Sequence, residues 1–136
     1  MKGFIELQEE ITKVIKENES KLSSLKIHIN SLPSNYRFGT YSIDAKICSR
    51  KQAIVLVGIL NERIKAAEDC RFEKEKREYQ EMKDKFLLTQ ELRHKISCVE
   101  TNLEDWKDME KECLELMTLE ENRQMYSEVA ERCLED

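Results

Sequence analysis

The scarcity of glycine and proline is the feature that most constrains this chain. It has three glycines and one proline among 136 residues, whereas chains of average composition have roughly 12% of the two together. Strand-rich folds use these residues at their turns. After Asp44 the only glycine is Gly58, and there is no further proline. The sequence therefore predicts an all-α fold made of a few long helices.

The composition indicates that these helices expose much of their surface. Charged residues make up 38% of the chain and hydrophobic residues 40%, and so many apolar residues argue against a disordered tail. High charge with little glycine and proline suits long, solvent-exposed helices. The length is that of one domain. We therefore expect a single elongated helical unit over residues 1–136.

An amphipathic helix is predicted over about residues 2–31. Its apolar residues recur at steps of three and four, as one face of a helix requires; they are Phe4, Leu7, Ile11, Val14, Leu22, Leu25, Ile29 and Leu32. The step of eight between Val14 and Leu22 places Asn18 on the same face. Asn18 is either a polar residue tolerated at a partly hydrated contact or one that sets the register of helix pairing.

Turn-forming residues predict an aromatic loop over residues 32–43. Pro33 cannot extend the first helix, and serine, asparagine, glycine and threonine recur around it. Tyr36, Phe38 and Tyr41 lie in this loop. Because aromatic side chains bury a large apolar area, we expect them to fold back over the end of a helix pair rather than to bind a ligand.

A very long helix is predicted over about residues 44–117. It begins either at a cap formed by Asp44 or at a capping box formed by Ser49 and Gln52. The apolar register shifts by one position near residues 86–92, where we expect a possible break. The N-terminal helix is predicted to fold back antiparallel on the start of this helix, as a helical hairpin with a coiled-coil extension.

An apolar run near the start of this long helix allows two interpretations. Residues Ala53–Leu60 are apolar except for a glycine, and a helix that is apolar all round is buried on several sides. A buried β-strand is the alternative, because β-branched residues are frequent in the run. The flanking sequences lack turn signals, which favours the helix, with Ile54 and Val57 on one face.

The clearest coiled-coil pattern lies further along the long helix. Apolar residues repeat there at steps that alternate mainly between four and three, as in a heptad; they are Leu92, Ile96, Val99, Leu103, Trp106, Cys113 and Met117. Either Met109 or Glu110 occupies the position between Trp106 and Cys113. We predict that this row pairs with another helix, and that Ile54, Val57 and Asn18 also contribute to helix interfaces. Trp106 either fills the row or anchors a partner, since tryptophan is enriched at binding hot spots.

The last part of the chain is acidic. Thr118 and Glu121 can form a capping box that starts a short helix over about residues 119–134; the alternative is that the long helix continues through this segment. Residues 100–136 contain 4 basic and 13 acidic residues, a net charge of −9. This segment is either a solvated surface or a site that binds a basic partner.

Nucleic-acid binding and membrane insertion are not expected. The lysines and arginines of residues 68–85 alternate with carboxylates, and the isoelectric point is near 5.3, so a continuous basic surface is missing. The longest apolar run has eight residues, against roughly 20 for a membrane-spanning helix. The first residues become polar immediately, so we expect no signal peptide.

The sequence predicts neither a catalytic site nor a bound cofactor or metal. It has two histidines and no glycine-rich loop, and the five cysteines occur at spacings unlike those of zinc ligands. Their odd number and wide separation suit a reduced compartment, so we expect an intracellular protein, cytoplasmic or nuclear.

The hypothesis that follows is a non-enzymatic coiled-coil subunit. It would act as an adaptor, tether or structural component, pairing with protein helices in a homodimer or a hetero-oligomer. The alternative is a compact four-helix bundle that binds a peptide or small ligand as a regulator or chaperone. That alternative requires helix breaks near residues 70–76 and 86–92.

Overall fold

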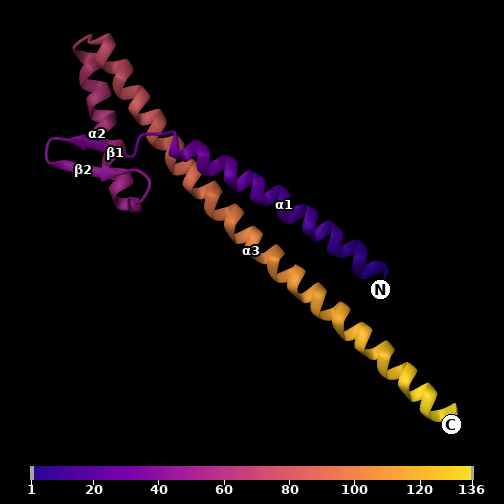
Figure 1. Cartoon of the computed structure of the whole chain (residues 1–136). Coiled ribbons are helices and arrows are strands. Elements are labelled where there is room, and N and C mark those ends of the chain that lie inside the picture. The colour runs from indigo at the N-terminus through magenta and orange to yellow at the C-terminus, as the bar shows by residue number, and fades with distance from the viewer. Residues whose placement is uncertain (1, 136) are drawn as a thin grey trace. The chain divides into compact units, whose positions relative to one another are not determined.

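The computed structural model describes the backbone of residues 2–135, and the side chains of residues 3–121 and of Arg123. The described chain consists of α1 (Lys2–Asn30), β1 (Asn35–Phe38), β2 (Tyr41–Asp44), α2 (Arg50–Asp69) and α3 (Glu73–Glu135) (Figure 1). Helix α1 packs on the long helix α3, and the two strands form one small antiparallel sheet. The predicted all-α class, with an N-terminal helix packed against a very long one, is confirmed.

The chain divides into two compact units, which we describe separately. The helix-pair unit comprises Met1–Ser23 and Cys98–Asp136, and the hairpin unit comprises Ser24–Ser97. Helices α1 and α3 each contribute residues to both units. Each unit has its own cluster of buried apolar residues.

In the helix-pair unit, α1 and α3 run antiparallel. The Cys113 thiol donates to the carbonyl of Phe4 over 3.7 Å, whereas the Thr12 hydroxyl donates to Glu110 over 3.2 Å. As residue numbers increase along α1, the residues that they contact on α3 decrease in number. Between the helices lie the buried residues Ile11, Ile15, Leu103 and Cys113 and the partly buried Phe4, Leu22, Trp106 and Met117. Each helix uses one face for this contact, as its apolar periodicity requires.

The hairpin unit has a core with contributions from the sheet, α2 and α3. Leu56 and Leu60 of α2 and Phe86 of α3 are completely buried. The ring of Tyr36 in β1 meets the ring of Phe86 edge-on, with 5.4 Å between centroids, a favourable arrangement for an aromatic pair. Ile43 of β2 completes the contact between the sheet and this core.

Residues 35–44 form a β-hairpin where the sequence predicted an aromatic loop. Tyr36 pairs with Ile43 and Phe38 with Tyr41 across the two strands, and aromatic and β-branched residues favour strands. The turn between them begins with Gly39, whose φ is +61°. Two-residue hairpin turns commonly place glycine at such a position. The aromatics do pack on helical residues, as predicted.

Helix α2 begins at Arg50, with Ser49 as its cap. The Ser49 hydroxyl accepts a hydrogen bond from the Gln52 amide over 3.2 Å, and the Gln52 side chain accepts one from the Ser49 amide over 2.9 Å. This is the predicted capping box. Asp44, the other candidate cap, instead accepts from the amide of Lys46 in the turn after β2. The helical interpretation of Ala53–Leu60 is therefore confirmed.

The predicted long helix over residues 44–117 is interrupted at residues 70–72. The amide of Phe72 donates to the carbonyl of Ala67, and the amide of Arg71 donates to that of Glu68, the two bonds of a Schellman ending. Arg71 adopts φ of 60°, a conformation usually taken by glycine. No glycine marks this helix end in the sequence, because an arginine occupies the position that glycine usually takes.

Two other predicted breaks are absent, because α3 continues through both. Within residues 86–92, the Thr89 hydroxyl donates to the carbonyl of Lys85 one turn earlier. Thr118 likewise donates to the carbonyl of Leu114, so its hydroxyl does not cap a new helix. Neither the separate short helix over 119–134 nor the second break of a four-helix bundle is formed within the described chain.

Candidate protein interaction surface

Most of the predicted helix-pairing row is covered by the chain itself. Leu103 and Cys113 are buried against α1, and Trp106 and Met117 are partly buried there. Leu92 and Val99 are also buried, and Ile96 is half-buried. The sequence predicted the N-terminal helix on the start of the long helix and a further helix on this row. That prediction is wrong for the four residues of the helix-pair unit, which α1 itself covers, because α1 pairs with a later part of α3.

The remaining predicted interface residues are not gathered at one surface. Val57 packs partly against the core of the hairpin unit, whereas Ile54 is 64% exposed. Asn18 is half-buried, and its side-chain amide donates to the carbonyl of Val14 over 3.0 Å. That bond lies within α1, so it supplies no evidence for a role in setting register.

An apolar groove lies along the paired helices α1 and α3 in the helix-pair unit. Its volume is about 340 Å³. Leu7, Ile11 and Val14 line it from α1, and Trp106 and Met109 line it from α3. Leu7 and Met109 are 41% and 44% exposed. Side chains of both helices thus present apolar atoms to solvent at a single place.

The groove follows from packing only two helices together. Two packed helices bury the side chains that face each other, and the apolar side chains on either side of the contact stay exposed to solvent. Leu7 and Val14 are seven residues apart and so share one face of α1, while Trp106 and Met109 are three apart on α3. A third helix laid along the groove would cover all four.

Charges at the rim of this groove have both signs. Glu10, Lys13 and Glu17 lie along α1 beside the apolar residues. Mixed charges surrounding an apolar centre are typical of protein interfaces, in which the rim stays hydrated.

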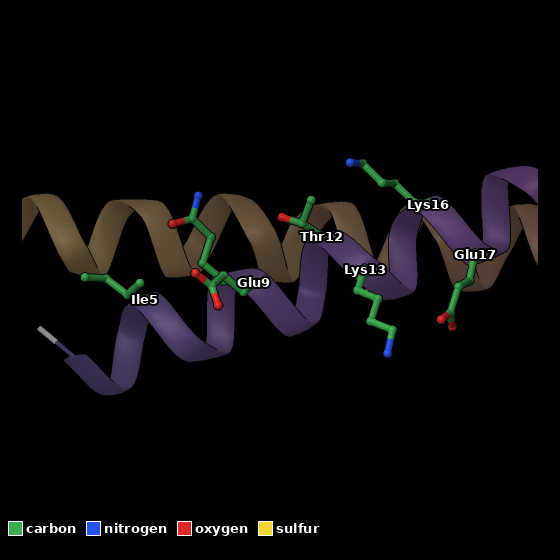
Figure 2. Close-up of a pocket in the computed structure, with 7 residues that line it drawn as sticks. Ile5, Glu9, Thr12, Lys13, Lys16 and Glu17 are labelled. Carbon is green, nitrogen blue, oxygen red and sulfur yellow. The ribbon is translucent and has the colours of Figure 1, made fainter.

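A second hollow on α1 has a different character. It is lined by Ile5, Gln8, Glu9, Thr12, Lys13, Lys16 and Glu17, which all belong to α1. Figure 2 shows the charged side chains spread along the helix and extending away from it. Thr12 is already bonded to Glu110. This surface is polar and open, so it lacks the apolar centre that would hold a helix.

The hairpin unit has a cleft of about 370 Å³ between β1 and α3. It is lined by Pro33, Asn35, Tyr36, Arg37, Phe38, Glu78, Glu81, Met82 and Lys85. Tyr36 contributes a buried hydroxyl that has no hydrogen-bond partner among the described residues. Burial raises the pKa of this hydroxyl above its ordinary value of 10.0, because removing it from water disfavours the charged form.

Neither a metal site nor a membrane span occurs within the described part of the chain. No three His, Cys, Asp or Glu side chains come together there in a way that could hold a metal ion. None of the helices has both the length and the apolar character that crossing a bilayer requires.

The chain gives no significant match to a protein family, to a curated protein or to a solved structure. Its surfaces are therefore the basis for inferring what it does.

Sequence periodicity predicted part of the groove. Leu7, Ile11 and Val14 belong to the predicted apolar face of the first helix, and Trp106 belongs to the predicted row of α3. Met109 was one of two candidates for the row position between Trp106 and Cys113. Glu110 takes that position, where it accepts a hydrogen bond from Thr12 of α1, and Met109 is 44% exposed beside it. Its exposure depends on how α1 covers α3, which the spacing of one helix does not determine.

Proposed function

We propose that this protein is a non-enzymatic interaction subunit that binds protein helices, as an adaptor, tether or structural component of an intracellular assembly. The observation that carries the proposal is the groove lined by Leu7, Val14, Trp106 and Met109. It offers apolar atoms from two helices beside a charged rim. A partner helix that docks there would complete a three-helix, coiled-coil-like contact.

Trp106 is the best candidate for the anchor of this contact. Its side chain is half-buried against α1, and it also lines the groove. Both roles considered from the sequence, a filler of the helix pair and an interface anchor, therefore suit its position. Tryptophan at the centre of a partly enclosed apolar surface commonly carries much of the binding energy.

The test is affinity capture from an extract of cells that express the protein, comparing wild type with the double variant Leu7→Ser, Met109→Ser. Both side chains are partly exposed, so the substitutions should leave the helix content and melting temperature nearly unchanged. We expect the captured proteins to be lost. Leu87→Ser is the matched control, since Leu87 is 43% exposed on α3 but lies in the hairpin unit.

Retention of the same proteins by the folded double variant would reject the groove as the binding surface. Their loss from the Leu87→Ser control to the same extent would show that capture reflects general hydrophobic adhesion.

A further inference from the structure

Helix α2 exposes a second apolar surface, which is separate from the groove. Ile54 and Val55 are 64% and 46% exposed, and Ile47, just before the helix, is 78% exposed. On the opposite side of α2, Leu56 and Leu60 are completely buried. The burial on several sides predicted for Ala53–Leu60 is therefore wrong: one side of the run is buried, and Ile54, Val55 and Gly58 are exposed to solvent.

Gly58 lies on this exposed side of α2, one turn after Ile54. A Cβ atom added to Gly58 would meet nothing within 4 Å, so no contact in the hairpin unit requires a glycine there. Inside a helix, glycine is less favourable than alanine because it loses more backbone freedom. A glycine on a helix surface permits another backbone to approach closely. Gly58 therefore suits an external helix that packs across Ile54 and Val55.

The charge around this surface is basic. Residues 45–61 contain Lys46, Arg50 and Lys51 and no Asp or Glu. Arg50 and Lys51 occupy the first turn of α2, which has no acidic residue. Positive charge is unfavourable at that end of a helix, because the helix dipole is positive there too. A docked acidic segment would compensate both the side chains and the dipole.

The acidic counterpart occurs in the same chain, in α3. Residues 112–121 contain Glu112, Glu115, Glu120 and Glu121 and no Lys or Arg. Leu116 and Leu119 of this segment are 49% and 63% exposed. They are three residues apart and hence share one face of α3. The segment thus presents leucines and carboxylates together, which complements the apolar and basic surface of α2.

We propose that the chain self-associates through these two surfaces. Residues 112–121 of α3 in one copy dock on residues 47–58 of a second copy. Leu116 and Leu119 cover Ile54 and Val55, Glu112 and Glu115 face Arg50 and Lys51, and Gly58 allows close approach of the backbones. Both surfaces belong to the same chain, so every copy offers one of each. This inference does not depend on the groove of the helix-pair unit.

The first experiment is sedimentation velocity of the purified full-length chain over a range of protein concentrations. We expect species heavier than the 16.2 kDa monomer, with a fraction that rises with protein concentration. Raising the salt from about 50 mM to about 500 mM should weaken association, because salt screens exposed charges.

Charge reversal tests the pairing of the two surfaces. Like-charge repulsion should weaken association by roughly tenfold or more in each of two double variants, Arg50→Glu, Lys51→Glu and Glu112→Lys, Glu115→Lys. A mixture of the two double variants should associate more strongly than either alone, because each supplies the surface that complements the other.

Gly58→Ala separates a docking role from a structural one. Alanine should raise the melting temperature of the chain, since it favours the helix and meets no neighbour. The added methyl group should nevertheless weaken self-association by several-fold. A higher melting temperature together with weaker self-association would therefore indicate that an external helix packs against Gly58.

A monomer at every concentration and salt would overturn the proposal. Association that is indifferent to both charge reversals, or to Gly58→Ala, would also overturn it by placing the contact elsewhere. The Leu7→Ser, Met109→Ser variant tests only whether partner proteins bind in the groove, whereas sedimentation velocity tests only self-association. Either proposal can therefore fail while the other holds.

Discussion

The two units solve the problem of burying apolar side chains in different ways. In the hairpin unit, a sheet, α2 and α3 surround one core, and Leu56, Leu60 and Phe86 lose all contact with solvent. In the helix-pair unit, two helices share a single line of contact, and several of its apolar residues stay partly exposed. A core enclosed on several sides is complete in the monomer. A pair of helices leaves apolar residues on its flanks, where further helices can bind.

The comparison predicts the largest loss of stability for Phe86→Ala. Phe86 is completely buried and contacts the ring of Tyr36, so truncation leaves a cavity enclosed by several elements. We expect a loss of about 3–5 kcal/mol in the free energy of unfolding, measured by urea denaturation. Phe72→Ala is the matched control, because Phe72 is 57% exposed. Similar losses in the two variants would contradict the enclosed core.

In the helix-pair unit, Ile11→Ala should cost less, about 2–3 kcal/mol. Ile11 is buried, but the partly exposed side chain of Trp106 beside it can shift to fill the space. Chemical denaturation followed by circular dichroism measures the change. Ile5→Ala on the exposed side of α1 should have little effect. If Ile11→Ala cost more than Phe86→Ala, the ranking of the two units would be reversed.

Arg71→Gly should stabilise the hairpin unit by up to about 1 kcal/mol. The substitution relieves the strain of an arginine at φ of 60°, partly offset by the greater freedom of glycine in the unfolded chain. Thermal melting provides the measurement, with Arg71→Ala as the control that keeps the strain. A lower melting temperature for Arg71→Gly would mean that the arginine side chain stabilises the fold by more than the strained backbone conformation destabilises it.

Tyr36→Phe should have the smallest effect at neutral pH and a larger one in alkali. It keeps the ring and removes a buried hydroxyl that has no partner among the described residues. Burial raises the pKa of this hydroxyl above 10.0, so the neutral form stabilises the fold fully below pH 10. That contribution is lost as the pH rises above 10 and through the raised pKa.

Wild type should consequently lose stability more steeply than Tyr36→Phe above pH 10, in melting curves recorded as a function of pH. Parallel curves for the two proteins would show that the hydroxyl titrates in the folded chain as it does in the unfolded chain.

Helical periodicity predicted much of the fold, because the spacing of apolar residues reports which face of a helix is buried. It identified α1, the apolar row of α3, and the capping box at Ser49 as one of two candidate helix starts, but it placed α1 on the wrong part of the long helix. It did not locate the end of α2, because that end depends on an arginine in a conformation typical of glycine. The alternating aromatic residues on either side of Gly39 do indicate a hairpin, although the turn-forming residues around them predicted a loop.

The candidate surfaces were less predictable than the helices. An apolar row predicts that something covers it, and the spacing alone did not distinguish α1 from a second protein. Ile54 shows the same limit, since an apolar run predicts burial but does not specify which side of the helix is covered. The groove and the surface of α2 consist of the apolar residues that remain after the chain has folded on itself.

The most direct test of helix binding is site-specific photo-crosslinking in cells that express the protein. A photoreactive amino acid would replace Met109 in the groove or, in a matched variant, the neighbouring Asp108, which is exposed and does not line it. We predict that position 109 crosslinks to a defined protein through a helical segment and that position 108 does not. Equal crosslinking from the two positions, or none from position 109, would contradict the proposal that this protein acts by binding helices in its groove.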